Sequence, residues 1–200
     1  MIRLDARTAA LVSQLERFAA DNDARATERS QKLLNLERPT AELVWLLITS
    51  GKRRRVLEIG TSNGYSAIWL ANALQATGGE PLVSIERDAA KAAQARENLA
   101  AASLDARVQV LEGDASALCA ALPGPFDCVF FDADRVSAPA QLAALLPRLA
   151  GDALLLADNA LSHPGEIAGY IEAVEASGQF DTFTVPVGKG LHVAQRREAA

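Results

Sequence analysis

Short apolar runs alternate with longer helical patterns from Arg55 onward, and this alternation constrains the fold more than any other feature. The apolar runs have the length of strands, and the stretches between them are long enough for helices. Strands that are apolar on both faces predict a parallel sheet with helices on each side. The expected strands are residues 56–59, 82–85, 108–111, 128–131 and 153–156, and the expected helices between them are 65–75, 88–102, 114–122 and 138–149.

The segment after the fifth expected strand completes this pattern. A helix is expected near Ser162 and Pro164, and two more strand-like stretches, 180–187 and 191–195, follow it. The residues between these stretches, Gly188-Lys189-Gly190, are typical of a hairpin turn. We therefore predict an α/β fold with a doubly wound, Rossmann-like sheet of seven strands. The sheet is mostly parallel with a final antiparallel strand, and helices lie on both faces.

Residues 1–50 are expected to form an N-terminal helical extension of a single domain, 1–200, whose α/β core spans 55–197. Apolar residues recur at helical spacing in the extension, with a break at Pro39. Its apolar faces either cover the sheet or join two copies of the chain, and we predict a homodimer. The apolar residues are Leu4, Leu11, Leu15 and Phe18, then Leu33, Leu34, Val44, Leu47 and Ile48.

Composition excludes several classes of protein. Half of the 200 residues are apolar and the formal net charge is −5, which argues against a nucleic-acid partner. The basic run Lys52–Arg55 is interpreted as a solvated strand entrance. No run of eighteen apolar residues occurs, so no membrane partner and no export are expected. Cys119 and Cys128 lie among apolar neighbours without metal-ligand spacing, which suits a reducing cytoplasm.

Nearly every expected strand ends in an acidic residue. Ligands of open α/β sheets bind outside the carboxyl ends of the strands, so these acids indicate a binding site. The residues in question are Glu58 before the loop Gly60-Thr61-Ser62-Asn63-Gly64, then Glu86, Asp114, Asp132 with Asp134, and Asp158 with Asn159.

The glycine loop after the first strand predicts a nucleoside cofactor. Gly60 and Gly64 let the backbone approach a ligand, and a carboxylate such as Glu86 at the tip of the second strand can bind ribose hydroxyls. The spacing lacks the tight fingerprint of pyrophosphate binding, and Glu58 beside the loop would repel a diphosphate. A cationic cofactor without phosphate fits better. An ordinary glycine turn is the alternative for the loop taken alone.

Asp132, Asp158 and Asn159 follow the fourth and fifth expected strands. Three hard oxygen donors that converge on one point suit Mg²⁺ or Ca²⁺. In the alternative reading, Asp132 caps a helix while Asp158 and Asn159 form a turn.

At these residues the sequence resembles the class I S-adenosylmethionine-dependent O-methyltransferases, in particular the cation-dependent group with catechol and caffeoyl-coenzyme A O-methyltransferases. The likeness covers residues 40–197 and is most specific at 56–66, 131–135 and 157–159. It implies methylation of a hydroxyl on a small catechol-like or other chelating substrate. It also implies a divalent cation on Asp132, Asp158 and Asn159. The implied cofactor residues are Glu58, Gly60, Ser62, Gly64, Ser66, Glu86, Arg87, Asp114, Ala115 and Asp132.

One residue departs from the family pattern. The family commonly has a general-base lysine where this chain has Arg135, and a guanidinium stays protonated and cannot accept a proton. Arg135 could instead orient an acidic group or stabilise an anion. Proton removal then falls to metal-lowered substrate acidity, to Asp134, or to Lys189. The expected catalytic residues are Asp132, Arg135 and Lys189.

Three other functions remain open from the sequence. They are a modified-RNA methyltransferase, a nicotinamide-dependent oxidoreductase, and a protein that binds the cofactor without turnover because it lacks the lysine base. His163 either lines the substrate pocket or is simply solvated. His192, Trp45 and Trp69 are interpreted as structural.

Overall fold

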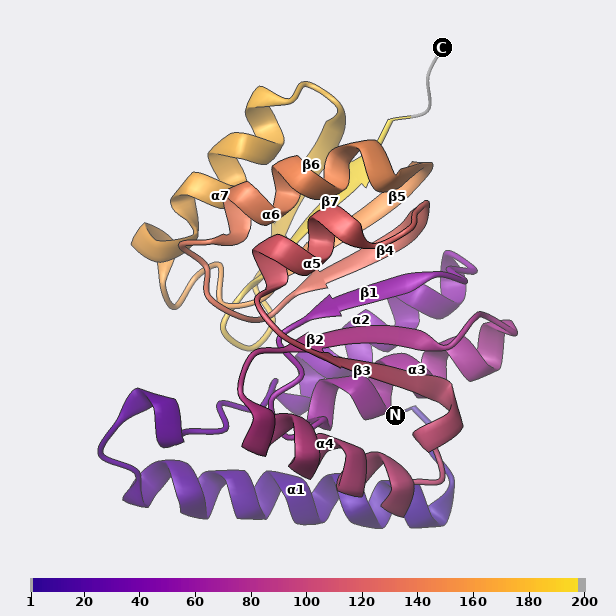
Figure 1. Cartoon of the computed structure of the whole chain (residues 1–200), viewed down its shortest axis with the longest axis vertical. Coiled ribbons are helices and arrows are strands. Elements are labelled where there is room, and N and C mark those ends of the chain that lie inside the picture. The colour runs from indigo at the N-terminus through magenta and orange to yellow at the C-terminus, as the bar shows by residue number, and fades with distance from the viewer. Residues whose placement is uncertain (1, 198–200) are drawn as a thin grey trace.

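The computed structural model describes residues 2–197, apart from the side chain of Arg29. Seven strands in this part of the chain form one sheet, and Figure 1 shows its layers. The strands are β1 (Val56–Ile59), β2 (Leu82–Glu86), β3 (Val108–Glu112), β4 (Phe126–Phe131), β5 (Leu149–Ala157), β6 (Phe180–Val185) and β7 (Leu191–Arg196). Their spatial order is β3-β2-β1-β4-β5-β7-β6.

The strand directions confirm the expected fold. Strands β1 to β5 are parallel, and β7 runs antiparallel to both of its neighbours, β5 and β6. Strand β5 begins at Leu149 rather than at Ala153. The sequence misplaced this boundary because Gly151 and Asp152 look like turn residues, yet they are exposed residues of a continuous strand.

Helices cover both faces of the sheet, as Figure 1 shows. One face packs against α1 (Ala6–Arg25), α2 (Arg38–Ser50), α3 (Tyr65–Thr77) and α4 (Ala89–Ala101). The other face packs against α5 (Ala115–Ala121), α6 (Ala138–Leu145) and α7 (Pro164–Ala176). Within the described residues, no helix is both long and apolar enough to span a bilayer.

Side-chain alternation along the central strands explains why two separate cores form. In β4, Cys128 and Phe130 belong to the core under α1 to α4, while Val129 and Phe131 belong to the core under α5 to α7. Successive side chains of a strand point to opposite faces, so a strand buried on both sides must be apolar throughout. Because both faces of these strands are covered by apolar cores, polar groups can gather only at the strand ends.

The helix expected around Leu33 and Leu34 is wrong. Residues 32–37 form neither helix nor strand, and α2 begins at Arg38 with Pro39 in its first turn. Proline is favoured there because the first turn needs no N–H from it, so Pro39 starts a helix rather than breaking one. Asp23 of α1 holds the irregular segment by accepting from the N–H groups of Leu33 at 2.8 Å and Leu34 at 2.9 Å, and two further contacts join it to the core. Leu33 O accepts from Ser62 Oγ at 2.9 Å, and Lys32 O accepts from Lys91 Nζ at 2.8 Å.

The interpretation of residues 52–55 as a solvated run is also wrong for Arg53. This side chain is buried and donates to Asp152 O at 2.5 Å and to Gln195 Oε1 at 2.9 Å. Arg53 therefore ties the start of β1 to β5 and β7. Long basic side chains can be buried when their polar ends find such acceptors, which a sequence run does not reveal.

Candidate active site

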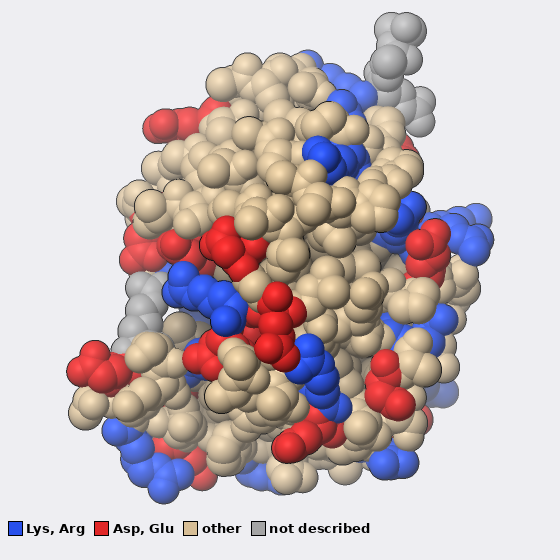
Figure 2. Space-filling model, in the orientation of Figure 1, with Lys and Arg blue, Asp and Glu red and all other residues tan. Residues whose placement is uncertain are grey.

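The strand order reverses between β1 and β4, so the loops after these two strands diverge and leave room for a ligand. Figure 2, in the orientation of Figure 1, shows acidic side chains gathered with basic ones on the side where the strands end. Residues expected from the sequence to bind a cofactor lie at or after the ends of β1 to β4, and those expected to bind an ion follow β4 and β5.

Gly60 lies where the loop after β1 meets the end of β4. Its φ is +104°, and its N–H donates to Ile85 O at 2.9 Å. A side-chain carbon placed here would lie 2.8 Å from the carbonyl carbon of Asp132 and nearer still to its oxygen. Glycine is required because the loop after β1 touches the backbone at the end of β4.

Glu86 is fixed at the tip of β2 by backbone donors. Its two carboxylate oxygens accept from the N–H of Ser62 at 2.8 Å and from the N–H of Asp88 at 2.9 Å. The side chain is almost fully buried, and each oxygen keeps further lone pairs for another donor. This arrangement can present a carboxylate to the hydroxyls of a sugar.

Glu58 is completely buried under the glycine loop. Its Oε2 accepts from Ser84 Oγ at 2.5 Å, while its Oε1 has no hydrogen-bond partner. Burial raises the pKa of Glu58 to about 7, against the lowering effect of the nearby Ser66 and Ser84 hydroxyls, and the charge of Glu86 adds to the rise. A cation bound in the loop would stabilise the ionised form of this acid.

Asp132 and Asp158 lie side by side at the ends of β4 and β5. Phe131 and Ala157 are paired in the parallel register, and the two aspartates come directly after them. Asn159 has a φ of +67°, and its Nδ2 donates to Asp158 Oδ2 at 2.7 Å. Asp158 Oδ1 is buried and has no hydrogen-bond partner.

The two aspartates repel one another. The pKa of Asp132 is raised well above its usual range, first by burial and then by the nearby charges of Asp158 and Glu58. Burial also raises the pKa of Asp158. The partly exposed carboxylate of Asp132, the buried carboxylate of Asp158 and an amide oxygen form a donor set that suits a hard cation, and the unpartnered Oδ1 of Asp158 provides a free ligand atom. Within residues 2–197 no cluster of three or more His, Cys, Asp or Glu side chains is arranged to hold a metal.

Lys189 lies beside this acid pair. The turn that carries it is bound to the loop after β5, because Lys189 O accepts from the N–H of Leu161 at 2.9 Å and from that of Ser162 at 3.1 Å. Its ammonium lies 3.9 Å from Glu37 Oε1 at the start of α2. The positive charge of Lys189 lowers the pKa of both aspartates, against the larger effect of burial.

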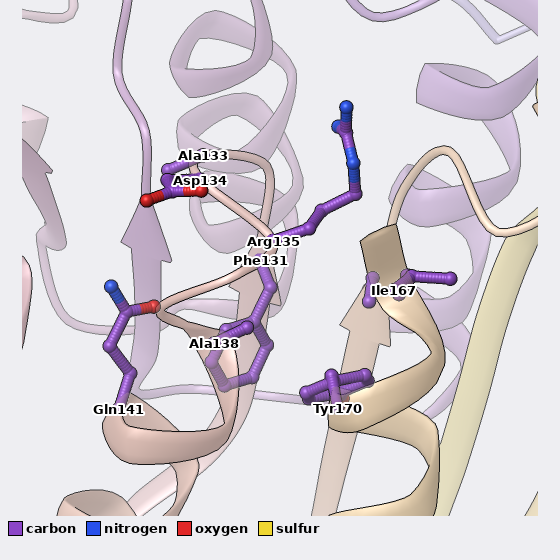
Figure 3. Close-up of a pocket in the computed structure, with 9 residues that line it drawn as sticks. Phe131, Ala133, Asp134, Arg135, Ala138, Gln141, Ile167 and Tyr170 are labelled. Carbon is purple, nitrogen blue, oxygen red and sulfur yellow. The ribbon is translucent and has the colours of Figure 1, made fainter. Parts of the chain in front are cut away.

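Arg135 forms an ion pair with Glu166 in the first turn of α7. Its Nη2 and Nε lie 2.7 Å and 3.1 Å from Glu166 Oε2. In Figure 3 its side chain points away from Phe131 and Tyr170, which line a small pocket beneath the loop. Asp134 accepts from Val136 N at 3.1 Å and from Ser137 Oγ at 2.9 Å, so both of its oxygens serve the turn before α6.

The remaining candidates lie in less distinctive places. Asp114 is exposed and caps α5 by accepting from Ala117 N at 3.0 Å; Ala115 is half-buried, and Arg87 is exposed. Gly64 and Ser66 open α3 below the glycine loop.

The histidines and tryptophans that the sequence left open lie as follows. His163 is half-buried, and its Nδ1 lies 2.8 Å from Ser162 Oγ. His192 is buried edge-on against Tyr170. Trp69 is fully buried, and Trp45 donates from Nε1 to Asn72 Oδ1 at 2.9 Å.

The sequence did not place Glu37, Thr40 or Leu33 near the site. All three belong to the N-terminal extension, which is about 100 residues or more from the acid pair along the chain. In the sequence, Glu37 before Arg38-Pro39 indicates only the start of a helix. Nothing in the sequence indicates that Glu37 lies opposite the turn with Lys189.

The fold and the strand-end residues define a doubly wound α/β protein of the class that binds a nucleoside cofactor at its switch point. A family model described as a methyltransferase domain matches residues 57–160, more than half of the chain. The chain belongs to this methyltransferase domain family.

Curated relatives include two catechol O-methyltransferases. That of Mycobacterium tuberculosis is 37% identical over 124 residues, which are 62% of this chain and 56% of the relative. That of Niastella koreensis is 35% identical over 120 residues, 58% of this chain and 53% of the relative. The chain thus spans about half the length of the curated relatives it matches.

Solved structures match over nearly the whole chain. An O-methyltransferase from Bacillus cereus in complex with SAH has a TM-score of 0.81 at 25% identity, with 98% of this chain and 93% of that chain covered. The O-methyltransferase TomG from Streptomyces achromogenes in complex with SAM has a TM-score of 0.75 at 27% identity, with 98% and 92% covered. These matches confirm the resemblance to class I O-methyltransferases.

Proposed function

We propose that this protein is an S-adenosylmethionine-dependent O-methyltransferase. On this proposal it uses a divalent cation, Mg²⁺ or Ca²⁺, to methylate a hydroxyl of a small catechol-like or other chelating substrate. The observation that carries the proposal is the pair Asp132 and Asp158 beside the glycine loop. Asp158 Oδ1 is buried there without a hydrogen-bond partner. The catechol O-methyltransferase relatives support the choice of substrate class.

The cofactor residues act by position and charge. S-Adenosylmethionine would supply the methyl group: as the methyl carbon bonds to the substrate oxygen, its bond to sulfur would break and S-adenosylhomocysteine would leave as a neutral thioether. The buried Glu58 lies under the loop formed by Gly60, Ser62 and Gly64, where an ionised carboxylate favours a positive sulfonium. Glu86 is held by two backbone donors and is assigned to the ribose hydroxyls. Ser66, Arg87, Asp114, Ala115 and the backbone of Asp132 border the rest of the cofactor in this proposal.

Asp132, Asp158 and Asn159 are assigned to the cation. Held by these residues, a divalent ion would supply Lewis-acid stabilisation of the substrate oxyanion. The hydrogen bond from Asn159 to Asp158 holds these two side chains together. The ion also offsets the repulsion that raises the pKa of Asp132.

The proton of the substrate hydroxyl needs an acceptor other than Arg135, because a guanidinium cannot take it. Asp134 already accepts two hydrogen bonds from its own turn. Lys189, whose ammonium lies beside the acid pair, is therefore not assigned the proton; a bound ion would instead make the hydroxyl acidic enough to lose its proton to solvent. Arg135 is assigned a positioning role, since its ion pair with Glu166 joins the loop after Asp132 to α7.

Transfer of a labelled methyl group from S-adenosylmethionine to a panel of catechols tests the proposal, with Mg²⁺, Ca²⁺ or a chelator present. We expect product with an ion and at least a hundredfold less with chelator. Asp158→Asn should lose the ion-dependent rate yet keep its affinity for S-adenosylhomocysteine by calorimetry. Asp105→Asn, an exposed acid outside the site, is the matched control.

The outcomes separate the alternatives. Transfer that is undiminished by chelator contradicts the ion site. Binding of NAD in place of S-adenosylhomocysteine indicates an oxidoreductase. Cofactor binding without transfer to any member of the panel indicates a binding protein, or a larger substrate such as RNA. The formal net charge of −5 and the internal hydrogen bonds of Arg53 count against RNA.

The proposal extends to the assembly and the location of the protein. Phe18, Leu34 and Leu46 of the N-terminal extension are about half exposed, which supports a homodimer through this region. Cys119 and Cys128 are free thiols buried in the core, which supports a cytoplasmic location. Sedimentation of the purified chain tests the dimer, and a monomer at micromolar concentration would contradict it.

A further inference from the structure

The turn between β6 and β7 places Lys189 at the end of β5. Strands β5 and β7 are antiparallel with Ala157 opposite His192. Ala160 N donates to Gly190 O at 2.9 Å, so the pairing continues past the strands as far as the loop after Asn159. The backbone of Lys189 is therefore fixed beside two of the three residues assigned to the ion.

The start of α2 packs against the same turn. A side-chain carbon on Gly188 would lie 2.5 Å from Thr40 Oγ1 and nearer still to Glu37 Oε2. Glu37 makes no capping hydrogen bond to its own helix. Its carboxylate is therefore available to the ammonium of Lys189, 3.9 Å away, and the positive end of the α2 dipole favours its charge.

Lys189 thus lies between two sets of negative charge. Its ammonium is 3.9 Å from Glu37 Oε1, and its charge also acts on Asp132 and Asp158. The side chains of Lys189 and Glu37 are each a little over one third exposed, which leaves the ammonium room for other rotamers, while the Lys189 carbonyl is bound to the loop after β5 by two hydrogen bonds. Lysine suits this position because its charge is compact and its stem is flexible.

We propose that Lys189 is a tethered counter-ion that competes with the divalent cation for Asp132 and Asp158, and that Glu37 holds its ammonium aside when the cation is bound. This inference rests on the proposed function, because it concerns the ion site assigned there. Without an ion, the ammonium offsets part of the repulsion between the two carboxylates. With an ion, the ammonium and the cation repel each other, and the pair with Glu37 reduces that cost.

The expected effects follow from Coulomb's law. One positive charge within several ångströms of a divalent ion, at an exposed mouth, weakens ion binding by about tenfold. Lys189→Met should therefore tighten Mn²⁺ binding by about tenfold. Glu37→Gln should weaken it several-fold, because the ammonium loses its alternative partner.

Mn²⁺ alone, titrated into the full chain without cofactor and followed by the spin-resonance signal of free Mn²⁺, measures these affinities directly. Lys52→Met is the matched control, since Lys52 is exposed and precedes β1 at the opposite end of the sheet. The double variant Lys189→Met/Glu37→Gln shows whether Glu37 acts through the lysine. If it does, Glu37→Gln costs less affinity in the Lys189→Met background than in the wild type.

Two results would overturn the inference while leaving the ion site intact. One is Mn²⁺ binding that is lost in Asp158→Asn but unchanged in Lys189→Met. The other is an equal loss from Glu37→Gln in both backgrounds. If neither the wild type nor Lys189→Met binds Mn²⁺ up to millimolar concentration, the ion site itself fails and the inference fails with it. Binding by Lys189→Met alone would support it.

Discussion

The backbone N–H of Ser62 donates to Glu86 Oε2 at 2.8 Å, which joins the loop after β1 to the tip of β2. Because Asp88 N–H occupies the other oxygen, Glu86 is oriented before any ligand arrives. Glu86→Gln should lower the affinity for S-adenosylhomocysteine by about 10- to 100-fold, since charged acceptors contribute about 1.5–3 kcal/mol per hydrogen bond. Calorimetry measures the change. Glu80→Gln, an exposed acid before β2, should leave the affinity unchanged.

Glu58 predicts a pH dependence of stability. Its pKa is raised from 4.5 to about 7 by burial, so the folded protein binds this proton more tightly than the unfolded chain does. The stability that this proton gives is complete below pH 4.5 and is lost as the pH rises through 7. The loss amounts to about 3 kcal/mol.

Glu58→Gln should remove that dependence. Between pH 5 and pH 8 the unfolding free energy of the wild type should fall relative to the variant, as measured by urea denaturation. Parallel curves for the two proteins over this range would contradict a buried Glu58 carboxyl with a raised pKa.

Gly60 predicts a large cost for an added methyl group. Gly60→Ala forces a side-chain carbon against the carbonyl group of Asp132 at a φ of +104°, and it should lower the unfolding free energy by about 3 kcal/mol or more. Gly78 also has a positive φ, +67°, but has no atom within 4 Å of the added carbon. Gly78→Ala should therefore cost only about 1–2 kcal/mol. Equal costs in urea denaturation would mean that the loop and β4 are not in contact.

Arg135 and Glu166 should behave as a unit. Arg135 is mostly buried, and its guanidinium lies 2.7 Å from Glu166 Oε2. A double-mutant cycle with Arg135→Met and Glu166→Gln should give a coupling energy of about 1 kcal/mol in unfolding measurements.

The same variants distinguish positioning from direct catalysis. If the pair only holds the loop after Asp132 in place, each single variant and the double variant should lower kcat by a similar factor. A much larger loss in Arg135→Met than in Glu166→Gln would show that the guanidinium meets the substrate directly.

Much of the fold was predictable because burial on two faces leaves a plain signal. The β-branched and leucine-rich runs predicted the five parallel strands. The acids at their carboxyl ends predicted the edge of the sheet at which the candidate site lies. The boundary of β5 was missed because Gly151 and Asp152 are tolerated near an exposed strand start. Leu33 and Leu34 were misassigned because their apolar spacing fits a helix, while Leu34 adopts a φ of +50°.

The candidate site was less predictable wherever it depends on contacts between distant segments. The position of Glu86 at the tip of β2 could be predicted from its place after an apolar run, while its role toward a ligand stays a prediction. The pairing of Arg135 with Glu166 and of Lys189 with Glu37 depends on side-chain directions that no local pattern specifies. Arg53 shows the same limit, because its acceptors come from β5 and β7.

The insertion of β7 between β5 and β6 has a consequence for biosynthesis. Strands β1 to β5 and the glycine loop leave the ribosome before the turn with Lys189. That turn reaches its final position only when β7 pairs with β5. A nascent chain can thus assemble its nucleoside pocket early. The two aspartates stay without their lysine neighbour until the last strand of the sheet has been synthesised.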